Sequence, residues 1–236
     1  MNRSDTSPDE RVHGPHQTQQ VAEYGAPLQR AKAAMILIHG RGASAASILQ
    51  LADEFAQEDI AYLAPQAAGN TWYPYSFLAP IDQNEPGLSS GLQAIEDVRH
   101  QIESTGIPSD RTIVLGFSQG ACLGLEYVAR NPRRYGGVVA FSGGLIGTGK
   151  RVDAAPPDDK HFEYNGSLDG TPVFLGCSDI DSHIPIRRVQ HSAEIMEGLE
   201  GTVTTRVYEG MGHTINEDEL SFVRSLLAEL VESSVP

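Results

Sequence analysis

Short continuous apolar runs along the chain end at turn-forming residues and alternate with segments in which apolar residues recur at helical spacing. A continuous apolar run is typical of a strand that is buried on both faces of a parallel sheet. The predicted strands cover 34–38, 60–64, 112–115, 137–141, 172–177 and 202–208. The predicted helices lie at 48–55, 88–102, 119–130, 186–199 and after residue 216. This alternation predicts an α/β fold with a mainly parallel central sheet and helices on both faces.

The last helix has the most clearly defined start. Asn216 is a suitable cap residue, and Glu219, three positions later, is placed to reach back to the backbone amide of the cap. Ile215 and Leu220 are spaced to pack on each other across the cap. These residues predict a loop that ends immediately before the helix.

Two long segments interrupt the alternation. The first, 66–87, contains prolines and a group of aromatic residues, and the second, 142–170, is rich in Gly, Pro and Asp. Loops of this length inside a compact domain are usually functional or disordered.

The composition is that of one acidic globular domain. The chain has 236 residues, with 31 Asp and Glu against 17 Lys and Arg, which gives a formal charge of -14. No repeat or shift in composition marks a second domain, so we predict a single domain over 21–236. Phosphate backbones and anionic lipid surfaces would repel such a chain, and nucleic acid is therefore not expected as a partner.

Residues 1–20 are polar and are expected to form a flexible tail. They lack the apolar core of a secretory signal, and the longest apolar run, 33–38, is too short to span a membrane. Cys122 and Cys177 both lie in apolar runs, which predicts buried, reduced thiols. A cytoplasmic protein without a membrane span is expected, while the oligomeric state is left open, a homodimer included.

A G-x-S-x-G motif at 116–120, with Ser118 at its centre, is the sharpest chemical signal. It follows a predicted strand and precedes a predicted helix, the context of a nucleophile elbow. A Cβ atom at position 116 or 120 would crowd the neighbouring chain. The alternative is a tight turn whose serine only caps the helix, and the strand–helix context favours the nucleophile.

A serine hydroxyl needs a base within hydrogen-bond reach to act as a nucleophile. His213 follows the last predicted strand and precedes the capped helix, which is the position of the base in this kind of fold. The other histidines are less well placed to act as the base. They lie in the tail, on helical segments, in the second long loop or in the loop that carries the acid. His39 lies at a strand end, where a structural role is favoured. These other histidines are His13, His16, His39, His100, His161, His183 and His191.

The third member of such a triad is an acid that holds the imidazole tautomer and stabilises the imidazolium. It is expected after the penultimate strand, where the loop following 172–177 supplies both Asp179 and Asp181. Position alone leaves both candidates open.

Two backbone N–H groups are needed to stabilise the oxyanion of a tetrahedral intermediate. The amide of Gln119 follows the nucleophile at a helix N-terminus, where the helix dipole also favours negative charge. The amide of Arg41 lies between two glycines after the first buried strand. We expect these two amides to form the oxyanion hole.

The motifs together resemble the phospholipase/carboxylesterase family of α/β hydrolases, which includes acyl-protein thioesterase-like enzymes. The similar stretches are 37–42, 115–121, 141–145 and 208–213, and they occur in the family's order. The resemblance covers the chain from about residue 33 to the end, and only the N-terminal part lies outside it.

The chain departs from the family pattern at the acid. The family has H-G-x-x-D-x-x-V-P there, and alignment on Pro185 places Asp181 on the acid and Cys177-Ser178 on the His-Gly pair. Arg41 stands where relatives often carry an apolar residue. The resemblance therefore favours Asp181, and it leaves the substrate preference open.

The resemblance implies a carboxylesterase that acts on a small-molecule ester through Ser118, His213 and Asp181 and an acyl-enzyme, with no metal, no cofactor and no large cap domain. A lysophospholipase and an acyl-thioesterase are the alternatives within enzymes. A non-catalytic α/β-hydrolase-fold binding protein is disfavoured, because the triad residues are all present.

Without a cap, the two long loops would form the walls of the substrate pocket. Five apolar residues of the first loop would then form an acyl- or aryl-binding lining: Trp72, Tyr73, Tyr75, Phe77 and Leu78. Anchoring of the loop to the hydrophobic core explains the same residues equally well.

Overall fold

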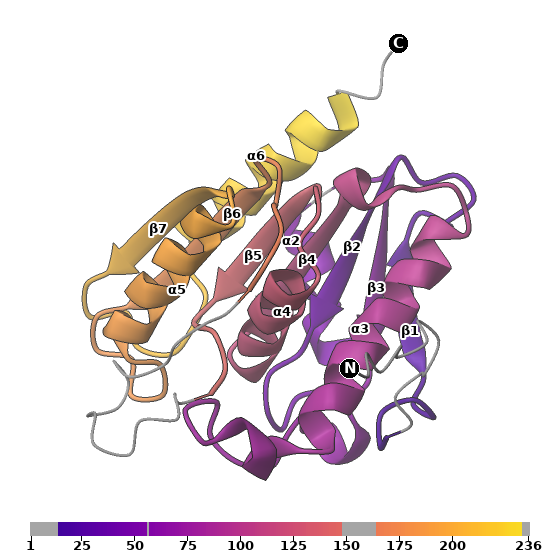
Figure 1. Ribbon diagram of the computed structural model, residues 1–236. Helices are drawn as coiled ribbons and strands as arrows, with labels where there is room; N and C mark the ends of the chain where they lie inside the picture. Colours follow the sequence, from indigo (N-terminus) through magenta and orange to yellow (C-terminus); the bar gives the residue numbers. More distant parts are fainter. Residues whose placement is uncertain (1–13, 56, 148–163, 233–236) are drawn as a thin grey trace, which may run out of the picture.

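The computed structural model describes residues 14–55, 57–147 and 164–232. At its centre is a seven-stranded sheet with the order β1-β3-β2-β4-β5-β6-β7 (Figure 1). The strands are β1 (Val21–Gly25), β2 (Ala33–Ile38), β3 (Ile60–Pro65), β4 (Thr112–Phe117), β5 (Gly137–Phe141), β6 (Pro172–Ser178) and β7 (Thr202–Tyr208). β1 is antiparallel to β3, and the other five neighbouring pairs are parallel.

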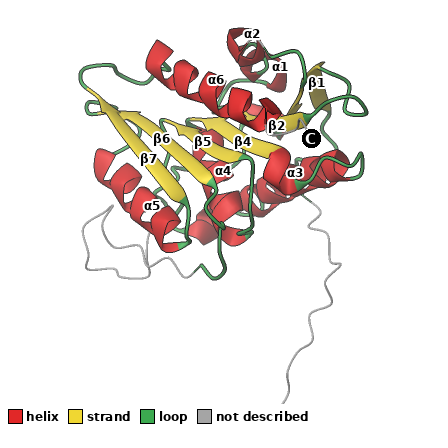
Figure 2. Cartoon of the chain, turned by 90° about the horizontal axis from the view of Figure 1, so that it is seen from above, coloured by secondary structure: helices red, strands yellow, loops and turns green. Residues whose placement is uncertain are grey.

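Helices cover both faces of this sheet. The α-helices are α1 (Ala45–Ile48), α2 (Leu51–Phe55), α3 (Gly87–Glu103), α4 (Gln119–Arg130), α5 (Ile186–Gly198) and α6 (Glu217–Glu232). Short 3₁₀ helices occur at η1 (Ala68–Asn70), η2 (Ile81–Asn84) and η3 (Ser109–Arg111). Figure 2 shows α1, α2 and α6 on one face of the sheet and α3, α4 and α5 on the other. The predicted layers are therefore confirmed.

The core consists of two hydrophobic layers that the central strands separate. Alternate side chains of a strand point to opposite faces. Ile36 and Ile38 of β2 accordingly pack in the layer beneath α3, α4 and α5, whereas Met35 and Leu37 pack with α1, α2 and α6. All six residues of β2 are buried, which explains why this strand is a continuous apolar run in the sequence.

Two local features differ from the sequence-based expectation. β1 was not predicted, because this strand is half exposed at the edge of the sheet and has no apolar run. The helix expected at 48–55 is two short helices, α1 and α2. Much of the second long loop, 148–163, lies outside the described residues.

Residues 14–20 also differ from the flexible tail expected over 1–20. His16 is buried, with 4 % of its surface exposed. Its backbone N–H donates to Ser90 Oγ, and its ring bonds the carbonyl oxygen of Trp72 and the amide of Ala68. Burial of the His16 imidazole against Trp72 and Ala68 therefore holds this segment on the domain. Residues 1–13 lie outside the described part of the chain.

The capped start of α6 is present as expected. The backbone amide of Asn216 donates to Glu219 Oε2, and the amide of Glu219 donates to Asn216 Oδ1. This reciprocal pair is a capping box. In the described ranges no helix has the length and apolarity needed to cross a membrane.

Candidate active site

Ser118 lies in a tight turn between β4 and α4, at the carboxyl end of the central strands. Its backbone has φ 56° and ψ −120°, a sparsely populated conformation for a residue with a side chain. Its amide donates to the carbonyl of Phe141 on the next strand, at 2.9 Å. A Cβ at Gly116 would lie 2.3 Å from the carbonyl oxygen of Gly120, and one at Gly120 would lie 2.0 Å from that of Ile38. Close backbone approach therefore requires glycine at both positions.

The loop after β7 brings His213 to the serine. His213 Nε2 lies 2.9 Å from Ser118 Oγ, and His213 Nδ1 lies 2.7 Å from Asp181 Oδ2. Since an ionised carboxylate only accepts hydrogen bonds, the Nδ1 atom carries the proton, and Nε2 is left to accept from the serine hydroxyl. The three side chains come from loops that are far apart in the sequence and form one continuous hydrogen-bonded chain.

Asp181 is held rigidly at the far end of this chain. Its side chain is fully buried, and Oδ1 accepts the backbone amides of His183 and Ile184 at 2.8 and 3.0 Å. Burial raises the pKa of this carboxyl, but the hydrogen bonds from His213 and from the two amides lower it by more, so the net pKa is below its usual value. Asp181 is therefore ionised at neutral pH.

Asp179, the other candidate acid, has a different partner. Its Oδ1 atom accepts the backbone amide of Gly210 at 2.8 Å, and the neighbouring Ser178 Oγ accepts the amide of Gly212 at 3.0 Å. Both glycines have positive φ, 68° and 78°, in the loop that carries His213. Asp179 thus shapes the histidine loop, and Asp181 contacts the imidazole itself.

The two residues whose amides are expected to stabilise an oxyanion border the same cavity as Ser118. Gln119 is the first residue of α4, and Arg41 follows β2. The neighbouring amides of Gly42 and Ala43 donate to the carbonyls of Asn70 and Gly40. Among the described residues, neither the Arg41 nor the Gln119 amide has a protein acceptor, so both are available to a ligand oxygen.

A cavity of about 660 Å³ opens above the serine, and residues 73–77 form one of its walls. The five residues of the first long loop that were predicted as lining divide into two groups. Tyr73, Tyr75 and Phe77 border the cavity, whereas Trp72 and Leu78 do not. Trp72 is fully buried, Tyr75 is 58 % exposed, and Leu78 packs partly buried against the core. Trp72 and Leu78 therefore fit the core-anchor interpretation, and Tyr73, Tyr75 and Phe77 stay candidates for a substrate lining.

Trp72 anchors the loop through two buried histidines. Its Nε1 atom donates to the carbonyl of His39, and its ring contacts the rings of His39 and His16 at centroid distances of 5.0 and 5.2 Å. His39 Nε2 accepts the amide of Ala67, so Nδ1 carries the proton and donates to Gly40. Burial lowers the pKa of both histidines. His39 therefore has the structural role that its position favoured.

Sequence reasoning did not assign a site role to three residues that border the cavity. His183 contacts the His213 ring edge to face at 4.9 Å, and Phe117 contacts it at 5.0 Å. Cys122 lies in the cavity wall, and burial raises the pKa of its thiol to about 12. Cys122 and Cys177 are both buried and free, as predicted. The only sequence signal for His183 was its place in the acid-bearing loop.

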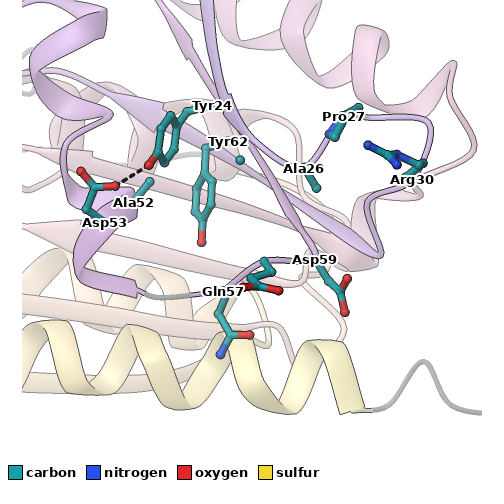
Figure 3. A pocket seen from close by; sticks show the side chains of 11 residues that line it. Tyr24, Ala26, Pro27, Arg30, Ala52, Asp53, Gln57, Asp59 and Tyr62 are labelled. Carbon is teal, nitrogen blue, oxygen red and sulfur yellow. Dashed lines mark hydrogen bonds between the residues drawn. The ribbon is translucent and has the colours of Figure 1, made fainter.

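A larger hollow, of about 740 Å³, lies at the β1 edge of the sheet (Figure 3). Tyr24 Oη donates there to Asp53 at 2.5 Å, and Tyr62 lies between this pair and Gln57. None of the eleven described residues that line it is a serine, cysteine or histidine. The Ser118 cavity, by contrast, is lined by the side chains of Ser118 and His213. In the described part of the chain, no cluster of three or more His, Cys, Asp or Glu side chains is arranged to hold a metal ion.

The chain matches known proteins over nearly its whole length. Residues 19–231 match the family Phospholipase/Carboxylesterase. Acyl-protein thioesterase 1 of Saccharomyces cerevisiae is 28 % identical, with 88 % of this chain and 97 % of the yeast protein covered. Acyl-protein thioesterase 1 of Eremothecium gossypii is also 28 % identical, with 86 % and 91 % covered.

A solved structure agrees with these matches. The crystal structure of a phospholipase/carboxylesterase from Dyadobacter fermentans is 44 % identical and superposes with a TM-score of 0.81, covering 89 % of this chain and 97 % of that one. The predicted α/β-hydrolase fold is thereby confirmed. Sequence and structure together show a hydrolase that belongs to the phospholipase/carboxylesterase family.

Proposed function

We propose that the protein is a serine esterase that cleaves carboxylic esters through a Ser118–His213–Asp181 triad and an acyl-enzyme intermediate. The observation that carries this proposal is the hydrogen-bonded chain from Ser118 Oγ through the imidazole to the buried carboxylate, at 2.9 and 2.7 Å. It supports the activation of a hydroxyl that is a poor nucleophile by itself.

In the acylation step, Ser118 Oγ attacks the ester carbonyl carbon and its proton passes to His213 Nε2. The negative charge that develops on the carbonyl oxygen is stabilised by the amides of Arg41 and Gln119. Asp181 stabilises the imidazolium and keeps Nε2 directed at the serine. Collapse of the intermediate breaks the carbon–oxygen bond, and His213 returns the proton to the departing alcohol.

In the deacylation step, water takes the place of the alcohol. His213 removes a proton from water, the resulting oxygen nucleophile attacks the acyl carbon, and the acid product leaves as Ser118 Oγ regains the proton. Every proton transfer in this cycle uses residues of the chain.

A second candidate function is the hydrolysis of acyl thioesters. It is favoured by the similarity to the two fungal acyl-protein thioesterases, which extends over most of each chain. The same triad serves both reactions, because the attacked atom is an acyl carbonyl carbon in each case. A lysophospholipase would use the same triad on an oxygen ester. It would differ from a small-ester esterase only in the size and shape of the substrate that the cavity must admit.

Labelling with a fluorophosphonate, followed by mass-spectrometric mapping, tests the nucleophile. We expect one modified residue, Ser118, and no modification of Ser118→Ala, which should retain the melting temperature of the wild type. Loss of triad function costs about 10⁶ in kcat. Labelling at another serine, or a tenth or more of the ester turnover in Ser118→Ala, would contradict the proposal.

Parallel series of 4-nitrophenyl esters and acyl thioesters from two to twelve carbons separate the two candidate functions. An esterase should show the higher kcat/KM on oxygen esters of matched chain length. A consistent preference for the thioesters would favour the second candidate.

A further inference from the structure

The side chain of Arg41 points at the aromatic loop, which we define here as residues 71–77. Its guanidinium group donates four hydrogen bonds to this loop: to Thr71 Oγ1 and to the carbonyl oxygens of Tyr73, Pro74 and Tyr75, at 2.7–3.0 Å. The group also lies 5.9 Å from the centroid of the Tyr73 ring. A planar group with donors in a fixed geometry is suited to such a multiple contact.

The side chain of Gln119 also bonds this loop. Its Oε1 atom accepts the backbone amide of Trp72 at 3.0 Å, and its Nε2 atom donates to the carbonyl of Tyr73 at 2.9 Å. The Tyr73 carbonyl is therefore shared by Arg41 and Gln119. Gln119 is buried, with 6 % of its surface exposed, so these bonds form where water competes little for them.

We propose that the side chains of Arg41 and Gln119 determine acyl specificity by clamping the aromatic loop to the two segments that supply the oxyanion amides. This inference rests on the proposed esterase function. Each of the two residues has two separate tasks: the backbone amide faces the oxyanion, and the side chain holds the pocket wall. Arg41 and Gln119 then set the distance between the reacting carbonyl group of the substrate and the pocket wall formed by residues 73–77.

The alternative role for an exposed arginine at an active site is to bind an anionic substrate. The geometry does not support that role, because four oxygen acceptors of the loop already occupy both terminal nitrogens of Arg41. A substrate anion would have to displace these bonds. The clamp therefore favours neutral acyl groups that extend along the wall.

Removal of the clamp should affect long acyl groups far more than short ones. An acetyl group ends close to the reacting carbon, whereas an octanoyl chain depends on an ordered wall. The oxyanion loop keeps its own backbone bonds, from Gly42 to Asn70 and from Ala43 to Gly40, so the Arg41 amide should remain in place. Small errors in substrate position lower rates by up to about 100-fold.

The test compares Arg41→Lys, which keeps the charge and the backbone amide, with Arg111→Lys. Arg111 is a matched control, because it also donates to backbone carbonyls, those of Lys32 and Leu230, far from the cavity. The readouts are kcat and KM for 4-nitrophenyl acetate and octanoate, and hydrogen exchange of residues 71–77 by mass spectrometry. Gln119→Glu, which retains the acceptor but loses the donor to Tyr73, is the second variant.

We expect Arg41→Lys and Gln119→Glu to lower the octanoate-to-acetate ratio of kcat/KM by about tenfold or more, and Arg111→Lys to leave this ratio unchanged. Exchange in 71–77 should accelerate in both variants and stay unchanged in Arg111→Lys. Equal losses on both esters, an unchanged ratio, or unchanged exchange would each overturn the inference. A wild type without ester turnover would instead contradict the proposed function, which separates the two failures.

Discussion

The nucleophile side and the acid–base side of the site are built in different ways. Ser118 is carried by central strands that are buried on both faces, and its turn allows only glycine at positions 116 and 120. Asp181 and His213 are carried by the loops that follow β6 and β7, and no residue of the edge strand β7 is fully buried. Tight backbone contact positions the first side, whereas hydrogen bonds between side chains and loop amides position the second.

Because the two sides are positioned differently, substitutions on them should have different effects. A side chain added at Gly116 or Gly120 would collide with neighbouring backbone atoms and would therefore act on folding. A change in the acid–base loops removes one polar contact and acts on geometry at the imidazole. The following predictions test the acid–base side and the segments that support the site, beginning with the largest effect.

Asp181→Asn and Asp179→Asn form a matched pair on the acid–base side, since both remove one charge and keep the shape of the side chain. Asp181→Asn should lower kcat by roughly 10⁴, because the imidazole loses the partner that selects its tautomer. Asp179→Asn should lower kcat by less than about tenfold and act mainly on the melting temperature, through the loop bond to Gly210. Steady-state kinetics and thermal melts of both variants provide the measurement.

The reverse ranking of the two variants would assign the acid role to Asp179. Equal, small effects on kcat would show that neither carboxylate orients the base in solution.

Trp72→Ala and Tyr75→Ala compare two residues three positions apart in the aromatic loop. Trp72 is fully buried between two histidines, so its truncation should destabilise the protein by about 3–5 kcal/mol. Tyr75 is 58 % exposed at the cavity, and its truncation should cost less than about 0.5 kcal/mol while raising KM for long acyl esters. Urea unfolding and a chain-length series measure the two effects. Similar losses of stability in both variants would show that the loop unfolds as one unit.

Glu219→Gln tests how the capping box at the start of α6, directly after the loop that carries His213, makes protein stability depend on pH. Burial raises the pKa of Glu219 to about 7, although the amide of Asn216 lowers it in part. Because the folded pKa lies above the ordinary value of 4.5, the carboxyl contributes stability at acid pH that is lost as pH rises through about 4.5 to 7. Glutamine preserves the capping box and does not titrate.

The free energy of unfolding of Glu219→Gln, measured relative to the wild type, should therefore increase by roughly 3 kcal/mol between pH 4 and pH 8. Urea titrations at four pH values in this range measure the difference, in which all other titrating groups cancel. A difference that stays constant with pH would show that the carboxyl is not desolvated in solution.

The sequence by itself determined the layers of the fold and the position of the nucleophile. The five inner parallel strands, β2 to β6, are buried on both faces and therefore appear as apolar runs, whereas the edge strand β7 is recognisable by its β-branched residues. The predicted strands at 137–141 and 202–208 coincide with β5 and β7. The G-x-S-x-G motif at Ser118 is readable because close backbone contact demands glycine at defined positions. The capping box of α6 is readable because its two partners are three residues apart.

Only the tertiary structure decided features that depend on contacts between distant segments. His16 is buried because it meets Trp72, 56 positions away, and composition alone suggested an exposed tail. Asp179 and Asp181 have the same chemistry and lie two positions apart, and the fold distinguishes them by bringing one to a glycine amide and the other to His213. The Arg41 side chain was equally unpredictable, because its four acceptors lie about thirty residues further along the chain. Local patterns encode burial and turns, whereas the partner of a long polar side chain is chosen by the packing of the whole domain.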